Sequence, residues 1–180
     1  AMLKVGQRLT QYRDALAGRR SGSQVSDPLA GVSSLTLGGE CHGGEKFNVV
    51  PERMAFTVDR RPIPEEPMPM VRQEMTQIEQ ELRQEGIDVR FRTLLEAEPF
   101  ATPPEHPGVQ ALRQAVAAAT GRAPQALLCP GFLDIRYLAQ LGIPAVASGP
   151  GRLSVAHGPA ECVAVAELSQ QALAFALLML

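Results

Sequence analysis

The amino-acid sequence predicts a protein of the α/β class, with an α+β domain followed by a shorter α/β segment. Three observations carry this prediction. In the first hundred residues, apolar side chains recur at helix and strand spacings in the order helix, strand, strand, helix, strand. The proline-rich residues 99–107 interrupt that pattern, and beyond them helices alternate with short apolar strands, which is typical of parallel α/β packing. We therefore expect two domains, residues 1–101 and 102–180, with a boundary near Thr102.

Apolar spacing identifies the elements of the first domain. Helices are expected over residues 2–19 and over about 68–85, where apolar side chains recur three or four positions apart. Strands are expected over 33–39, 53–59 and 87–95, where apolar and polar residues alternate. The residues that define the apolar faces are Val5, Leu9, Tyr12, Leu16, Leu35, Leu37, Met54, Phe56, Val58, Val71, Met75, Ile78, Leu82, Ile87, Val89 and Phe91.

The first domain is one strand short of a ferredoxin-like, split β-α-β fold. That fold needs strand, helix, strand, strand, helix, strand, and the strand lacking here would precede the first helix. We therefore expect a truncated domain whose sheet has an unpaired, partly apolar edge. Because such an edge favours strand pairing or swapping between chains, the sequence predicts a homodimer or a higher oligomer. A flexible loop is expected over residues 20–27, which are rich in serine.

The second domain alternates helices with short apolar strands. Helices are expected over 109–120 and 134–141, and strands over 126–129 and 144–147. The apolar stretch 163–180 is interrupted by polar residues and is short for a bilayer span of about 20 residues. We therefore expect it to form a buried helix of the domain.

Composition and charge exclude several classes of partner. A formal net charge of -2 provides no basic field for a nucleic acid, and no Lys/Arg-rich block indicates a membrane surface. The three cysteines, Cys41, Cys129 and Cys162, lack the short spacings of a zinc cluster or a disulfide framework. They indicate a reducing, cytoplasmic environment, in which each is expected to be a small buried hydrophobe.

The first candidate site follows the glycine-rich residues 38–44. Asn48 lies in the loop after them, and strand alternation places Asp59 and Arg61 on one face of the next strand. An amide and a guanidinium together make a good clamp for a carboxylate, because the guanidinium donates two parallel charge-assisted hydrogen bonds. The alternative is a surface ion pair beside a turn asparagine, which composition alone favours.

Two further segments follow predicted strands of the second domain. In the first, Gly131 and Phe132 precede Asp134, which stands where a helix N-cap belongs. In the second, His157 lies between a strand and the last helix, and a neutral imidazole is a common zinc ligand. The carboxyl ends of strands in an α/β sheet are where ligands bind. A single histidine without partners is, however, more often part of the polar surface.

Together, these segments resemble the di-zinc amidohydrolases and exopeptidases that include acetylornithine deacetylase, succinyl-diaminopimelate desuccinylase, aminoacylase and carboxypeptidase G. The motifs that carry the resemblance are G-G…N-V-V-P…D-R-R, G-F-L-D-I-R and G-P-G…A-H-G-P-A-E, in that order. The resemblance covers nearly the whole chain. It implies that residues 1–101 are a ferredoxin-like lid or dimerisation domain and that 102–180 are the closing part of a parallel-sheet catalytic domain.

The resemblance also implies roles for single residues. His157 matches the last zinc ligand of an enzyme that holds two zinc ions. Asn48 and Arg61 match lid residues that hold the substrate carboxylate, with Asn48 reaching into the site of the partner subunit. Gly131 and Phe132 match a loop that lines the substrate pocket.

The family's other site residues have no counterpart in this sequence. These are its H-x-D ligand pair, its bridging aspartate, its adjacent pair of glutamates and a further acidic ligand. The sequence therefore predicts a fragment of a zinc-dependent N-acyl-amino-acid amidohydrolase that is inactive alone and contains no catalytic residue of its own. The alternative is a stand-alone dimerisation or small-carboxylate-binding module without catalytic activity.

Overall fold

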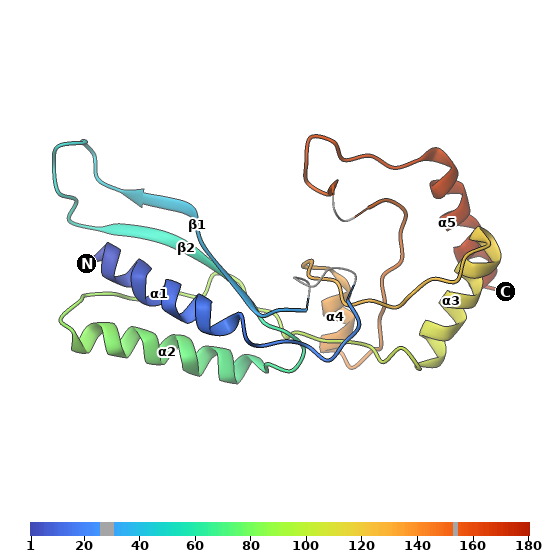
Figure 1. Ribbon diagram of the computed structural model, residues 1–180, viewed down its shortest axis with the longest axis horizontal. Helices are drawn as coiled ribbons and strands as arrows, with labels where there is room; N and C mark the ends of the chain where they lie inside the picture. The colour runs from blue at the N-terminus through green and yellow to red at the C-terminus, as the bar shows by residue number, and fades with distance from the viewer. Residues whose placement is uncertain (26–30, 153–154) are drawn as a thin grey trace. The chain divides into compact units, whose positions relative to one another are not determined.

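The computed structural model describes residues 1–25, 31–152 and 155–180, and these form two compact units (Figure 1). The first unit consists of Ala1–Phe100 together with Leu128–Phe132, and the second of Ala101–Leu127 and Leu133–Leu180. Helices and a pair of strands occur together, so the predicted mixed α/β class is confirmed. The loop expected over residues 20–27 lies partly outside the described residues.

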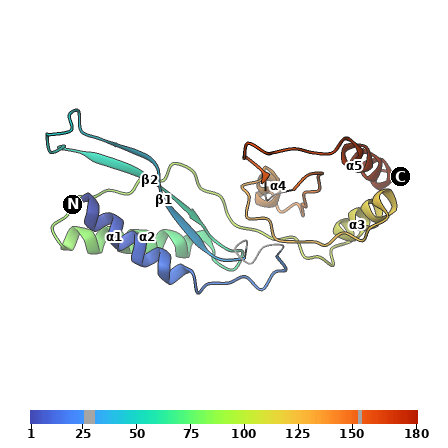
Figure 2. The same cartoon turned by 45° about the horizontal axis from the view of Figure 1, so that its top comes forward.

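The first unit contains a strand pair and two helices. Helix α1 spans Met2–Leu16 and α2 spans Met68–Gln84, while β1 (Ser34–Gly43) pairs antiparallel with β2 (Met54–Arg61). Figures 1 and 2 show both helices on one side of this hairpin. The register runs from Ser34 opposite Arg61 to Gly43 opposite Met54, with an irregularity between Leu37 and Cys41.

The predicted helix faces form the core of the first unit. Every buried residue of α1 belongs to the predicted apolar face, and Leu9 and Leu16 are fully inaccessible to solvent. They pack with Leu35 of β1 and with Ile78 and Leu82 of α2. Burying a leucine side chain stabilises a fold by about 1.5–3 kcal/mol, so this cluster fixes the two helices against the hairpin.

A buried ionic cluster joins the end of β2 to both helices. The carboxylate of Glu66, whose residue is only 3% exposed, accepts hydrogen bonds from Ser33 Oγ at 2.6 Å and from the backbone N–H of Ile63 at 3.1 Å. It also accepts from Arg19 at 2.7 Å and from Arg60 at 2.8 Å. Burial by itself raises the pKa of Glu66, but these hydrogen bonds outweigh burial and lower it.

Glu74 of α2 extends the same cluster toward α1. Its carboxylate accepts hydrogen bonds from Tyr12 Oη at 2.6 Å and from Arg19, while Arg60 donates to Tyr12 Oη at 3.2 Å. Burial raises the pKa of Glu74, but the hydrogen bonds from Arg19 and Tyr12 lower it further than burial raises it. No buried side-chain polar atom of the described residues lacks a hydrogen-bond partner, so the burial of these charges is compensated.

The strand predicted over residues 87–95 is wrong for the described residues, because this segment forms no strand and pairs with none. Ile87 is buried and Val89 and Phe91 pack partly on the core, so the alternation expected from the sequence holds up to that point. The backbone is bound by side chains of α2 instead, because Arg83 Nε donates to Val89 O at 2.8 Å and Phe91 N donates to Glu79 at 2.7 Å. Among the described residues the sheet has two strands, since alternation sets the buried face but does not supply a neighbouring strand.

The second unit contains three helices: α3 (Pro107–Thr120), α4 (Ile135–Gln140) and α5 (Val165–Leu178). Helices α3 and α5 pack against each other. The predicted strands over 126–129 and 144–147 are wrong for the described residues. Leu128 forms only an isolated bridge to Val25 of the first unit, and the backbone of Ala145 bonds with the side chain of Thr102.

Two burial predictions in the sequence are also wrong. The terminal helix was expected to be buried, but Ala174 is the only buried residue of α5 in the described chain, and Val165 is 78% exposed. Cys41 and Cys162 are exposed rather than buried, and all three cysteines are free thiols. Among the described helices, none combines the length and the apolarity needed to cross a bilayer.

We expect the first unit to lose stability when the pH falls below the ordinary pKa of a glutamate carboxyl, about 4.3. Folding lowers the pKa values of Glu66 and Glu74. Their contribution to the free energy of unfolding is therefore complete at a pH above the pKa of the unfolded state. It is lost as the pH falls through the folded-state values. Urea unfolding at several pH values, followed by amide exchange in α1 and α2, measures this.

The variant Glu66→Gln should reduce that pH dependence and destabilise the unit by about 3 kcal/mol at neutral pH, since it leaves buried arginines without their counter-charge. Asp14→Asn is the matched control, because its partner Arg13 forms an exposed pair with it at 3.0 Å. Removing that pair should change the free energy of unfolding by less than about 1 kcal/mol. An unchanged acid transition in Glu66→Gln would show that the cluster does not control it.

Candidate functional site

Arg61, the last residue of β2, is held by two hydrogen bonds. Its Nε donates to Asp59 Oδ2 at 2.8 Å, so the prediction that Asp59 and Arg61 share one face of the strand is confirmed. Its Nη1 donates to the backbone oxygen of Pro130 at 3.2 Å. Both side chains of the ion pair are 54% exposed. The guanidinium is therefore directed at a surface where a ligand has access to it.

The segment Leu128–Phe132 belongs to the first unit although the second unit flanks it in the sequence. The backbone N–H of Leu128 donates to Gln24 O at 2.8 Å and fixes the segment there. Pro130, which contacts Arg61, directly precedes Gly131 and Phe132. The structure thus brings Arg61 beside the loop that contains two other predicted site residues, which are about 70 positions away in sequence.

Asn48 does not lie near Arg61 within one chain. It is in the loop that joins β1 to β2, beside the pair Gly43–Met54, whereas Arg61 is at the opposite end of the hairpin. The eight residues of β2 give seven steps from Met54 to Arg61, a length of about 23 Å at a rise of about 3.3 Å per residue. One chain therefore does not bring both residues to a single carboxylate, because an antiparallel hairpin places its loop far from its open end.

His157 lies in a tight turn of the second unit and is exposed. Its backbone has φ 61°, in the left-handed region that residues other than glycine rarely adopt. The turn is stabilised by the carboxylate of Glu161, which accepts the His157 backbone N–H at 3.0 Å, and by Gly158 N donating to Val155 O at 3.1 Å. Unusual backbone conformations of this kind are found often at functional sites.

The residues present do not make a metal site by themselves. Across residues 1–25, 31–152 and 155–180, no group of three or more histidine, cysteine, aspartate or glutamate side chains could hold a metal ion. Glu161, the acidic residue nearest to His157 in the turn, uses one carboxylate oxygen for the backbone. A zinc ion needs about four ligands, so the donors of the described residues do not hold one by themselves, and the sequence assigned this chain only one ligand, His157.

The N-cap role expected for Asp134 is wrong. The residue stands at the N-cap position of α4, but its backbone is in the right-handed helical region and its side chain makes no capping hydrogen bond. Its Oδ1 instead accepts from Arg136 Nη1 at 3.0 Å. The Asp134 carboxylate therefore pairs with the side chain of Arg136 and does not stabilise the N-terminus of α4.

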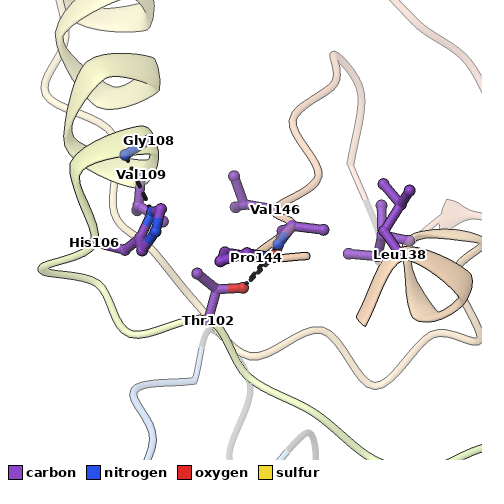
Figure 3. A pocket seen from close by; sticks show the side chains of 9 residues that line it. Thr102, His106, Gly108, Val109, Leu138, Pro144 and Val146 are labelled. Carbon is purple, nitrogen blue, oxygen red and sulfur yellow. Dashed lines mark hydrogen bonds between the residues drawn. The ribbon is translucent and has the colours of Figure 1, made fainter. Parts of the chain in front are cut away.

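A shallow pocket in the second unit was not predicted from the sequence (Figure 3). It has a volume of about 290 Å³, and Val109, Ile135 and Leu138 contribute apolar lining. Its polar groups are engaged with the backbone: His106 Nδ1 accepts from Gly108 N at 3.1 Å, and Thr102 Oγ1 donates to Ala145 O at 2.6 Å. His106 is the N-cap residue of α3. The sequence signal for this cap is Pro107, which follows it at the first helical position.

Comparison with known proteins identifies the family. The profile described as Peptidase family M20/M25/M40 matches residues 14–180, and the chain belongs to this family. It is 32% identical over 132 residues to an acetylornithine deacetylase of Myxococcus xanthus. The aligned region covers 72% of this chain and 33% of that protein. The family resemblance expected from the sequence motifs is therefore confirmed.

The same fold occurs in a solved structure. An M20 family metallo-carboxypeptidase of Sulfolobus solfataricus, Sso-CP2, matches 94% of this chain and 40% of its own chain, with a TM-score of 0.62 and 16% identity. At that identity the match concerns the fold alone. The chain spans about a third of the length of the curated relative that it matches.

We expect Glu161→Ala to loosen the His157 turn while leaving the helices of the second unit intact. Loss of the hydrogen bond to the His157 N–H should raise the exchange rate of that amide roughly fivefold, for about 1 kcal/mol of lost hydrogen bonding. Glu161→Gln is the matched variant, since its side-chain oxygen still accepts the hydrogen bond. Equal protection of the His157 amide in all three proteins would mean that Glu161 does not hold the turn.

Proposed function

We propose that this chain is part of a zinc-dependent N-acyl-amino-acid amidohydrolase of the deacetylase, desuccinylase or peptidase type. The single observation that supports this proposal most is the hydrogen bond from Arg61 to the Pro130 carbonyl, because it brings together two motifs that are distant in the sequence. The match of this chain to a deacetylase also supports it. The chain contributes substrate binding and one metal ligand, and it is inactive alone.

Arg61 is the proposed binding residue for the carboxylate of the substrate. A guanidinium keeps its charge at any physiological pH and matches the planar geometry of a carboxylate. Gly131 and Phe132, which directly follow Pro130, are proposed to line the substrate pocket beside it. Glycine leaves room for close approach of the substrate, and the exposed ring of Phe132 offers an apolar surface to its side chain.

His157 is the proposed zinc ligand, and the other ligands and the general base come from outside this chain. An imidazole in a strained, exposed turn is preorganised to meet donors of another segment. Since the donors of this chain alone do not make a zinc site, no step of the reaction is assigned to it. The residues Arg61 and His157 thus bind and orient, and neither is proposed to transfer a proton.

Asn48 is proposed to act in the site of a partner subunit within a homodimer. Its position at the far end of the hairpin from Arg61 supports a role outside the site of its own chain. The unpaired side of β2 and the extended segment 87–91, which has no strand partner in the described chain, support association through the sheet.

The second candidate is a stand-alone dimerisation or small-carboxylate-binding module without catalytic activity. The observation that favours it is that the arginine site is formed by this chain alone, while no described cluster of donors could hold a metal. Both candidates predict carboxylate binding at Arg61. They differ in whether activity appears when the missing ligands are supplied.

We expect the isolated chain, with zinc in excess, to release no amine from a panel of N-acyl amino acids above the uncatalysed background. The physical reason is the shortage of zinc ligands and of a general base. Turnover that disappears in His157→Ala would contradict the proposal, since this chain would then assemble a complete metal site. Activity gained when the remaining part of a family hydrolase is added would favour the first candidate over the second.

We expect the chain in solution to be at least a dimer, because an unpaired strand edge exposes backbone donors and acceptors. Light scattering should give a mass of at least twice the 19.3 kDa of one chain. A proline at a β2 position whose backbone N–H faces away from β1 removes an edge donor and should shift the mass toward that of one chain. A monodisperse monomer for the unchanged chain would contradict the proposed assembly.

A further inference from the structure

The guanidinium of Arg61 is occupied on two sides and open on the third. Nε donates to Asp59 Oδ2 at 2.8 Å, and Nη1 donates to Pro130 O at 3.2 Å. Within the part of the chain that the structure describes, no acceptor contacts Nη2. Because a guanidinium has five N–H donors in one plane, fixing Nε and Nη1 also fixes the direction in which Nη2 donates.

We propose that Asp59 is a positioning residue for carboxylate binding by Arg61, a proposal that rests on the function proposed above. Asp59 and the Pro130 carbonyl hold the guanidinium plane in one orientation, and the carboxylate of an N-acyl amino acid binds at the open Nη2 side. Arginine loses much rotamer freedom when it binds a ligand. A side chain that is already ordered loses less, so preorganisation strengthens the binding.

A simple surface ion pair would have the opposite effect. The negative charge of Asp59 lies beside the guanidinium and weakens the attraction of Arg61 for a second anion. If Asp59 acted only through its charge, removing it would therefore strengthen carboxylate binding. If it acts by orienting Arg61, removing it weakens binding. The two roles thus predict changes of opposite sign for the same substitution.

The experiment uses the full chain and the ¹⁵Nε–H resonance of Arg61 as the signal. N-acetylglycine is the probe, and N-acetylglycinamide, which lacks the carboxylate, is the control ligand. In the unchanged chain, N-acetylglycine should shift the resonance and N-acetylglycinamide should not. In Asp59→Ala the Nε–H should exchange faster with water, and the apparent dissociation constant for N-acetylglycine should rise by about tenfold.

Two further variants separate geometry from charge. Asp59→Asn loses the charge but keeps a hydrogen-bond acceptor, so it should restore binding to the level of the unchanged chain or better. Asp14→Ala is the matched control, because Asp14 accepts from Arg13 Nε at 3.1 Å in an exposed pair elsewhere on the unit. That variant should leave both the Arg61 signal and the binding of N-acetylglycine unchanged.

The outcomes distinguish this inference from the proposed function. Binding that is unchanged or tighter in Asp59→Ala, with the probe still shifting Arg61, overturns the role of Asp59 and leaves carboxylate binding standing. If N-acetylglycine fails to shift the Arg61 resonance of the unchanged chain, carboxylate binding by Arg61 is overturned and the positioning role with it.

Discussion

The buried carboxylate of Glu66 is the constraint on which the first unit depends. It accepts hydrogen bonds from Ser33, which directly precedes β1, from Arg19, which follows α1, and from Arg60 near the end of β2. Because successive side chains of a strand point to opposite faces, fixing Arg60 toward the interior directs its neighbour Arg61 outward. The exposed arginine of the candidate site is thus placed by an ion pair in the core, and the two residues have different surroundings although they are adjacent and chemically identical.

The proposed site residues are divided between the two units. Arg61 and the segment 130–132 belong to one compact unit, and His157 belongs to the other. Carboxylate binding is therefore proposed for residues of the first unit and metal binding for a residue of the second. Asn48 and Arg61 lie at opposite ends of the hairpin, which agrees with the proposed place of Asn48 in a partner subunit.

Sequence patterns predicted the features that depend on local periodicity. The apolar face of α1 and the shared face of Asp59 and Arg61 follow from 3.6-residue and two-residue repeats, and both are found. Features that depend on neighbours were not predictable in this way. Ile87, Val89 and Phe91 alternate as in a strand, yet a strand also needs a partner with free backbone groups.

The terminal helix illustrates the same limit. Its composition indicates burial, but burial depends on which other segments cover it, and in this chain Val165 and Met179 remain exposed. Likewise, no periodic pattern predicts that the carbonyl oxygen of Pro130 accepts a hydrogen bond from Arg61, since that contact joins residues about 70 positions apart. Local rules therefore identified the helices and the β1–β2 hairpin, whereas the other predicted strands depended on long-range pairing that the sequence pattern does not reveal.

The inclusion of Leu128–Phe132 in the first unit has a consequence for how the two units are connected. The polypeptide crosses between the units at residue 100, again at 127 and once more at 132. The first unit is therefore built from two separate stretches of the sequence. A proteolytic cut near residue 100 would place these two stretches on different fragments. A fragment ending at that cut would lack the Pro130 carbonyl that accepts from Arg61. The surroundings of Arg61 thus draw on both stretches, and exchange of one terminal segment between two proteins would not transfer them together.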